Sequence, residues 1–254
     1  MKLWNLKNLC IIFLGAFLVI SAMDQRAEAL FGIGENAKAP RMIVVMVDMS
    51  GSTNAARRTV YRNAFDKIYQ SFREGDRIVV GTITGTSFID FKPVVDAEIP
   101  KKSVWVNRIS FEQNTTKTKN TIKEKVEGLL SRKKGTPRTE ILNSLNIADT
   151  LFHNEKRNKI LVILSDMVQD SKEYNFARVQ VTDTYIENII KYRKRNKLVP
   201  NLKGVKVYVA GASAEEARKF RSIEKFWNRY FKVTGADFST HRYGHSLLEF
   251  EKDA

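Results

Sequence analysis

The chain has 254 residues, of which 43% are hydrophobic, and this composition excludes a protein that is disordered throughout. Lys and Arg number 43 against 28 Asp and Glu, giving a formal net charge of +15. Such a balance favours anionic partners: acidic proteins, envelope polymers, lipid headgroups or nucleic acid. The only cysteine is Cys10, so the stability of the chain beyond it has to come from an apolar core rather than from a disulfide.

The first residues predict an export signal. Lys2 and Lys7 precede an apolar run, Leu9 to Ala22, which is shorter than the roughly 20 residues that a transmembrane helix needs. Ala27-Glu28-Ala29 has the A-x-A pattern of a cleavage site, and cleavage after Ala22 is an alternative. We therefore expect three parts: a signal peptide at 1–29, a linker at 30–40 and a domain at 41–254. The domain is expected in the periplasm or outside the cell, with an uncleaved membrane anchor as the alternative.

The first element of the domain is a run of five apolar residues, Ile43 to Val47, which predicts a strand buried on both faces. The run ends at Asp48, and Ser50 and Ser52 follow in a D-x-S-x-S pattern. Ligand sites of parallel sheets lie at the carboxyl ends of the strands, and hard oxygen donors without sulfur or imidazole suit Mg²⁺. A turn and a helix cap are an alternative explanation of the same residues.

Helix and strand signals then alternate to the end of the chain. The alternation predicts a three-layer α/β fold in which a mainly parallel central sheet carries helices on both faces. Further strands are expected at 77–84, 159–164 and 205–210, with an antiparallel edge strand at 87–95 paired to the first of these. Helices are expected at 56–72, 118–132, 140–153, 183–195 and 214–233. The aromatic residues of the last helix favour packing against the sheet over binding of a partner.

Two later segments carry oxygen donors at matching places. The strand at 159–164 ends in Ser165-Asp166, again a carboxylate after an apolar run. Thr139 directly precedes the helix at 140–153, where its hydroxyl could cap the helix, and Thr136 is an alternative donor three residues earlier. The loops that hold these residues are therefore expected to meet above one sheet.

Together these segments resemble the von Willebrand factor A family, whose metal ion-dependent adhesion site combines D-x-S-x-S, a threonine before a later helix and an aspartate closing a later strand. The resemblance extends from Arg41 to about Tyr243 and implies a Rossmann-like fold with an antiparallel edge strand. It implies a metal site made of Asp48, Ser50, Ser52, Thr139 and Asp166. Mg²⁺ is the expected ion, with Mn²⁺ or Ca²⁺ as alternatives. The glycine that often follows the last aspartate of the family is replaced by Met167 here.

The resemblance also implies a module for binding or assembly rather than an enzyme, in which an Asp or Glu of a protein partner completes the coordination of the ion. Enzyme signals are weak, because His241 and His245 have no acidic residue between them and the Gly-x-Ser-x-Gly motif is missing. A metal-assisted hydrolase or phosphoryl-transfer enzyme is one alternative. Metal-independent binding of an anionic envelope polymer, through basic clusters at 132–138 and 191–197, is another. Nucleic acid is not expected, since no nucleic-acid motif accompanies the charge, and no stable membrane span is expected after signal cleavage.

Overall fold

The computed structural model of the chain describes residues 38–51, 53–85, 91–103, 105–132 and 135–251. Contacts divide the chain into two compact units, Met1–Ala39 and Pro40–Ala254, and every described helix and strand belongs to the second unit. The signal peptide predicted at 1–29 lies outside the described residues and stays a prediction. Within the described ranges, no helix is both long and apolar enough to cross a membrane.

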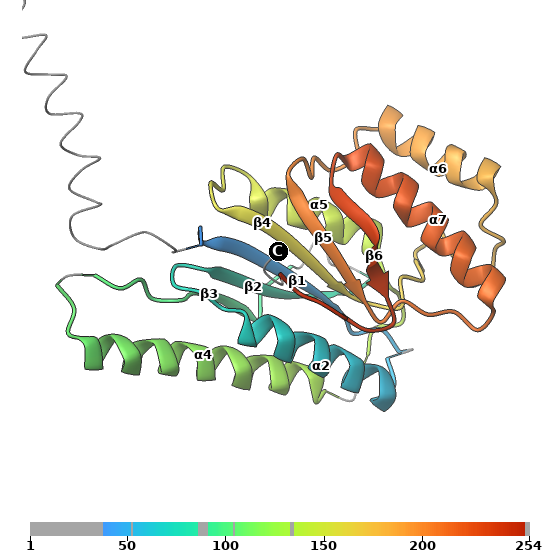
Figure 1. The fold of residues 1–254 in the computed structure, drawn as a ribbon. Helices are drawn as coiled ribbons and strands as arrows, with labels where there is room; N and C mark the ends of the chain where they lie inside the picture. Colours follow the sequence, from blue (N-terminus) through green and yellow to red (C-terminus); the bar gives the residue numbers. More distant parts are fainter. Residues whose placement is uncertain (1–37, 52, 86–90, 104, 133–134, 252–254) are drawn as a thin grey trace, which may run out of the picture. The chain divides into compact units, whose positions relative to one another are not determined.

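A six-stranded sheet forms the centre of the second unit, in the order β3-β2-β1-β4-β5-β6 (Figure 1). The strands are β1 (Arg41–Asp48), β2 (Arg77–Ile83), β3 (Val95–Glu98), β4 (Asn158–Leu164), β5 (Val205–Ala210) and β6 (Asp237–Gly244). Neighbouring strands are parallel except for β2 and β3, which are antiparallel. The predicted α/β class, with a mainly parallel sheet and one antiparallel edge strand, is therefore confirmed.

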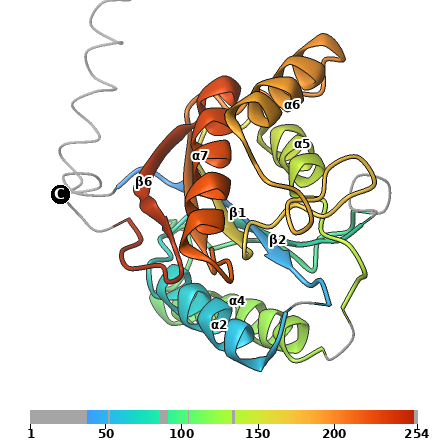
Figure 2. The same ribbon diagram turned by 90° about the vertical axis from the view of Figure 1, so that its right-hand side faces the viewer.

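Helices cover both faces of this sheet (Figures 1 and 2). One face carries α2 (Ala55–Gln70) and α4 (Arg108–Leu130), and the other carries α5 (Ile141–Phe152), α6 (Asp183–Arg195) and α7 (Ala217–Thr234). The side chains of β1 alternate between the two apolar layers, as the pleat of a strand requires: Ile43, Val45 and Val47 join the layer of α2 and α4, whereas Met42, Val44 and Met46 join the other. All eight residues of β1 are buried. The three-layer architecture follows from this central strand.

The two edge strands differ from the sequence-based expectation. The predicted edge strand at 87–95 is wrong in its extent, because β3 begins only at Val95. Residues 91–94 are described and lie outside the strand, and Pro93 among them has no N–H to donate to a ladder; residues 86–90 lie outside the described ranges. β6 is not expected from the sequence, since most of its residues are polar and partly exposed.

The helix expected at 118–132 also begins earlier than predicted. α4 starts at Arg108, and the side chain of Asn107 accepts a hydrogen bond from the backbone N–H of Ile109 at 2.8 Å. The buried residues of α4 begin only at Ile122. The apolar periodicity therefore marks the half of the helix that packs on the sheet and misses the half that does not.

The amino end of β1 carries a buried ion pair. Arg41 and Asp76 have side chains that are 1% and 0% exposed, and Arg41 Nε donates to Asp76 Oδ2 at 3.1 Å. The backbone N–H of Arg41 donates to Asp76 Oδ1 at 2.7 Å, and Arg41 Nη2 donates to the carbonyl oxygen of Ser71 at 2.6 Å. The positive charge of Arg41 at this end of the strand is thus neutralised by the carboxylate of Asp76.

Replacing Asp76 by alanine is expected to lower the free energy of unfolding by ~3–5 kcal/mol, because it leaves the buried Arg41 without a counter-charge. The matched control is Asp96→Ala, which breaks the Arg77–Asp96 pair, whose side chains are 34% and 43% exposed. That exposed pair is expected to contribute about 1 kcal/mol or less. Urea unfolding of both variants measures the difference, and equal losses would contradict this account.

Candidate functional site

Three loops meet at the carboxyl ends of β1 and β4, where the sheet continues to β2 on one side and to β5 on the other. Ligand sites of open parallel sheets lie at such a switch point. Gly51 N–H donates to the carbonyl oxygen of Thr136 at 2.8 Å, and Thr139 N–H donates to that of Asp170 at 2.9 Å. A Cβ on Gly135 would lie 2.6 Å from the carbonyl oxygen of Ser50. Only glycine therefore allows the loop before α5 to approach the loop after β1 so closely.

A cavity of about 710 Å³ opens between these loops. Three of the predicted metal ligands line it: Ser50, Thr139 and Asp166. Asp48 is fully buried behind this lining, while Ser52 lies outside the described residues. The structure therefore brings four of the five predicted ligands to one edge of the sheet.

The carboxylate of Asp48 is held by neutral donors. Its Oδ1 accepts the backbone N–H of Ser50 at 2.8 Å, and its Oδ2 accepts the hydroxyl of Ser165 at 2.8 Å. Burial first and the nearby charge of Asp166 second raise the pKa of Asp48 to about 6. In the described part of the chain, Asp48 forms no ion pair, and both of its oxygens accept hydrogen bonds from uncharged groups.

Asp166 is paired differently, because a cation of the protein reaches it. Arg57 Nη1 donates to Asp166 Oδ2 at 2.8 Å, and Arg57 Nη2 donates to the hydroxyl of Ser213 at 3.1 Å. The other oxygen of Asp166 accepts the backbone N–H of Val168 at 2.9 Å. Arg57 belongs to the first turn of α2 and lines the cavity, so a guanidinium occupies one oxygen of a predicted metal ligand.

Sequence reasoning missed Arg57. It is followed by Arg58, whose Nη1 donates to the carbonyl oxygen of Thr53 at 2.8 Å instead. Two adjacent helical residues face different directions, and only the fold shows which of them meets a loop from β4. The available signal was the position itself, a basic residue shortly after the D-x-S-x-S pattern.

The geometry favours Thr139 over Thr136 as an oxygen donor. Thr139 lines the cavity, and within the described residues its hydroxyl makes no hydrogen bond, whereas the hydroxyl of Thr136 donates to the carbonyl oxygen of Arg138 at 3.0 Å. Thr139 does not cap the next helix: α5 begins at Ile141, with Glu140 at the cap position, and Gln169 Oε1 accepts the N–H of Leu142 at 3.0 Å. The Thr139 hydroxyl is thus left to face the cavity.

Met167 stands in the loop after β4, at the position where the resemblance predicts a glycine. Its φ of 65° lies in the left-handed region that favours glycine. Its N–H donates to the Ser165 hydroxyl at 3.0 Å, and its carbonyl oxygen accepts the indole N–H of Trp227 at 2.9 Å. Trp227 is a buried residue of α7, so the aromatic face of that helix packs into the core and also holds the loop that carries Asp166.

A cation at this site would depend on hydroxyl oxygens as well as carboxylates. In the ranges that the structure describes, no group of three or more His, Cys, Asp or Glu side chains is placed to hold a metal ion. The donors that converge are instead two carboxylates, Asp48 and Asp166, and two hydroxyls, Ser50 and Thr139. Such an all-oxygen set fits Mg²⁺, Mn²⁺ or Ca²⁺, and burial together with the neighbouring charge of Asp166 raises the pKa of Asp48.

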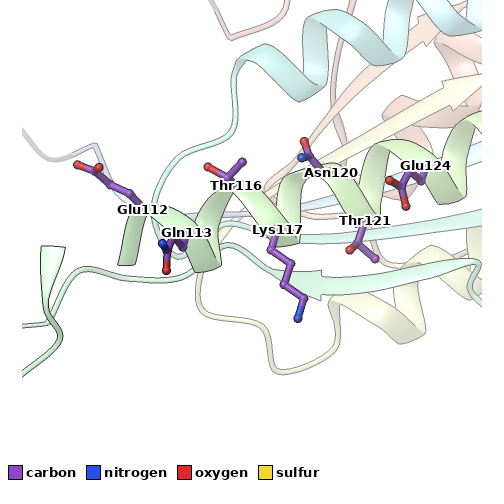
Figure 3. Close-up of a pocket in the computed structure, with 7 residues that line it drawn as sticks. All are labelled: Glu112, Gln113, Thr116, Lys117, Asn120, Thr121 and Glu124. Atoms are coloured by element: carbon purple, nitrogen blue, oxygen red, sulfur yellow. The ribbon is translucent and has the colours of Figure 1, made fainter. Parts of the chain in front are cut away.

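A second hollow, of about 550 Å³, runs along α4 and is lined by polar side chains of that helix (Figure 3). Glu112, Lys117 and Glu124 are among them, and Figure 3 shows the side chains leaving successive turns in different directions. Because they do not converge on one point, this hollow does not form a second candidate site.

Comparisons with known proteins do not assign the chain to a family. No family model and no curated protein matches the sequence. Among solved structures, a von Willebrand factor type A protein from Catenulispora acidiphila is 13% identical, with a TM-score of 0.44 over 78% of this chain and 42% of that one. Proximal thread matrix protein 1 from the mussel byssus is 15% identical, with a TM-score of 0.41 over 79% of this chain and 47% of that one.

Manganese-loaded TRAP protein from Plasmodium vivax is also 15% identical, with a TM-score of 0.39 over 73% of this chain and 62% of that one. This chain therefore spans less than two thirds of the length of each of the three proteins. At these values the similarity assigns neither a family nor a site. The resemblance seen in the motifs stays a prediction, and the fold class rests on the strand order and register described above.

The contribution of Asp48 to the stability of the protein in EDTA is expected to fall as the pH rises from about 4 to about 6. The pKa of Asp48 is about 6 in the folded protein against 3.8 for an ordinary Asp, so between these values the folded state binds more protons than the unfolded state. Asp48→Asn removes this titration and is expected to be more stable than the parent above pH 6, by up to about 3 kcal/mol.

Urea unfolding in EDTA between pH 4 and pH 7.5 measures this effect. The difference between the two proteins isolates Asp48, because all other carboxyl groups titrate in both. An Asp48→Asn variant that is less stable than the parent at pH 7 would refute the account.

Proposed function

We propose that this chain binds a divalent cation, in the first place Mg²⁺, above β1 and β4, and uses it to bind an acidic group of a protein partner. The observation that carries the proposal is the carboxylate of Asp48, which is fully buried, accepts hydrogen bonds from neutral donors and lies near a second carboxylate, Asp166. A buried charge is costly unless an opposite charge compensates it. A bound cation would supply that charge.

The described donors have distinct roles in this proposal. Asp48 and Asp166 would supply negative charge, and the hydroxyls of Ser50 and Thr139 would supply neutral oxygens. Two carboxylates balance the two charges of the ion, and Arg57 adds a further positive charge at the cavity wall. A site with this balance attracts an anionic oxygen, which the cavity leaves room to admit.

The charge of the whole chain supports the same class of partner. A formal net charge of +15 favours encounter with acidic proteins. This contribution weakens with salt, because exposed charges are screened over about 10 Å at 0.1 M ionic strength. The ion would give the contact its direction, since an Asp or Glu of the partner replaces one water in its coordination shell.

Calorimetric titration of the chain from residue 30 with Mg²⁺ and Mn²⁺ tests the site. We expect binding by the parent and at least a roughly tenfold weaker affinity for Asp48→Ala and Thr139→Ala, since each removes an oxygen donor. Thr136→Ala is the matched control and is expected to bind the ions like the parent. The Thr136 hydroxyl donates a hydrogen bond to the carbonyl oxygen of Arg138 and is not proposed as a ligand. A folded parent that binds neither ion would refute the proposal.

Replacing Arg57 by methionine is expected to strengthen Mg²⁺ binding by up to about tenfold, because the guanidinium both occupies Asp166 Oδ2 and repels the ion. Arg62→Met is the matched control: it makes the same charge change on the same helix, where Arg62 pairs with Glu127 on α4. The same titration measures both variants. An equal gain in the two would assign the effect to net charge rather than to the Arg57–Asp166 contact.

A further inference from the structure

Exposed apolar side chains gather at the start of α4. Trp105 is 92% exposed, Ile109 is 63% exposed and Val106 is 43% exposed. These three residues, here called the Trp105 corner, stand within five positions of one another. Exposed apolar residues scattered singly are ordinary, but a group that includes an almost fully exposed tryptophan marks an interaction surface.

The fold places this corner at the end of the sheet that lies away from the cavity. β3 runs antiparallel to β2, with Glu98 opposite Arg77, so the chain leaves β3 beside the amino end of β2. The Trp105 corner and the start of α4 follow there. The first turns of α4 extend past the neighbouring α2 (Figure 1), and α4 has no buried residue before Ile122.

The same segment is strongly basic. Residues 101–125 carry a formal net charge of +5, from Lys101, Lys102, Arg108, Lys117, Lys119, Lys123 and Lys125 against Glu112 and Glu124. Lys101, Lys102 and Arg108 directly flank the Trp105 corner and are exposed. An apolar tip with exposed basic residues before and after it is complementary to an anionic lipid surface, where an indole ring occupies the headgroup level and Lys or Arg contact the phosphates.

A protein groove or a second copy of the chain fits this surface less well. A helix that docks in a groove, or pairs with another helix, presents apolar residues at every third or fourth position. Beyond Ile109 and Phe111, the exposed half of α4 up to Thr121 contains only polar and charged residues. The contact is therefore a short apolar tip rather than a helix face, which suits shallow insertion between lipid headgroups.

We propose that the Trp105 corner docks the domain on a membrane surface rich in anionic phospholipid. Trp105, Val106 and Ile109 insert at the headgroup level, and the flanking Lys and Arg side chains contact the lipid phosphates. The inference is independent of the metal site, because it uses residues at the other end of the sheet. Docking in this way leaves the cavity at the carboxyl ends of β1 and β4 open to the solvent.

Co-sedimentation with vesicles tests the proposal, using the chain from residue 30 in EDTA. This chain contains the whole compact unit Pro40–Ala254 with the sheet and both apolar layers, and it lacks the apolar run at 9–22, which would itself bind lipid. We expect binding to vesicles of phosphatidylglycerol and phosphatidylcholine, and little binding to phosphatidylcholine alone. EDTA separates the result from the proposed function, which requires a metal ion.

The variant Trp105→Ser/Ile109→Ser is expected to lower the partition coefficient at least about tenfold, and Lys101→Gln/Lys102→Gln by about fivefold for each charge. Lys194→Gln/Lys197→Gln makes the same charge change on another exposed basic segment and is expected to leave binding close to that of the parent. Thermal unfolding confirms that each variant is folded. Parent-like binding by the Trp105→Ser/Ile109→Ser variant would overturn the proposal, as would no binding by the folded parent, the result expected if an acidic protein covers this surface.

Tryptophan fluorescence supplies a second, local measurement. The chain from residue 30 contains two tryptophans, Trp105 and Trp227, and Trp227 is fully buried. A blue shift on addition of anionic vesicles therefore reports on Trp105, and it is expected to disappear in the Trp105→Ser/Ile109→Ser variant. Vesicle binding without this shift would place the contact elsewhere on the protein and contradict the proposal.

Discussion

The central strand β1 constrains the whole domain, because it is buried along its full length and carries a charged residue at each end. At the amino end, Asp76 compensates Arg41 with several hydrogen bonds. At the carboxyl end, Asp48 receives hydrogen bonds from Ser50 and Ser165. The charges at the two ends of β1 are both buried, but only Arg41 has an oppositely charged partner beside it. Arg41 is neutralised by Asp76, which stabilises the fold. Asp48 keeps its negative charge beside the cavity between the three loops.

Several features that cost folding free energy lie together in the loops around Asp48. Burial first and the charge of Asp166 second raise the pKa of Asp48, Met167 adopts a left-handed conformation, and a Cβ on Gly135 would clash with the backbone of Ser50. Strain and unbalanced charge of this kind persist only where the surrounding fold enforces them. Here the enforcement comes from the backbone bonds between the loops and from the indole of Trp227. These loops are therefore held in shape by the protein's own hydrogen bonds.

How much the sequence predicts depends on how completely an element is buried. The apolar runs of β1 and β5 predict buried strands, and strands are observed there. The helix α6 is observed at 183–195, as predicted. β3 and β6 lie at the edges, where one side of the strand meets solvent or a loop, so their sequences carry little apolar signal. α4 buries no residue before Ile122, so its first half has no apolar periodicity from which a helix could be predicted. Arg57 escapes for another reason: its partner Asp166 is distant in sequence, and only the fold brings them together.

The two proposals use opposite ends of one sheet, and the parallel strands make that separation possible. In a parallel sheet every loop of the carboxyl edge can contribute a ligand, while the amino edge remains available for other contacts. β3 runs antiparallel to β2, so the chain returns to the edge of the sheet at the amino ends of the parallel strands, and α4 follows from there. A protein held at the Trp105 corner would keep the cavity that Thr139 and Asp166 line away from the lipid. The proposed membrane contact and the proposed capture of an acidic partner would then require no domain motion, because the rigid sheet sets the distance between the two surfaces.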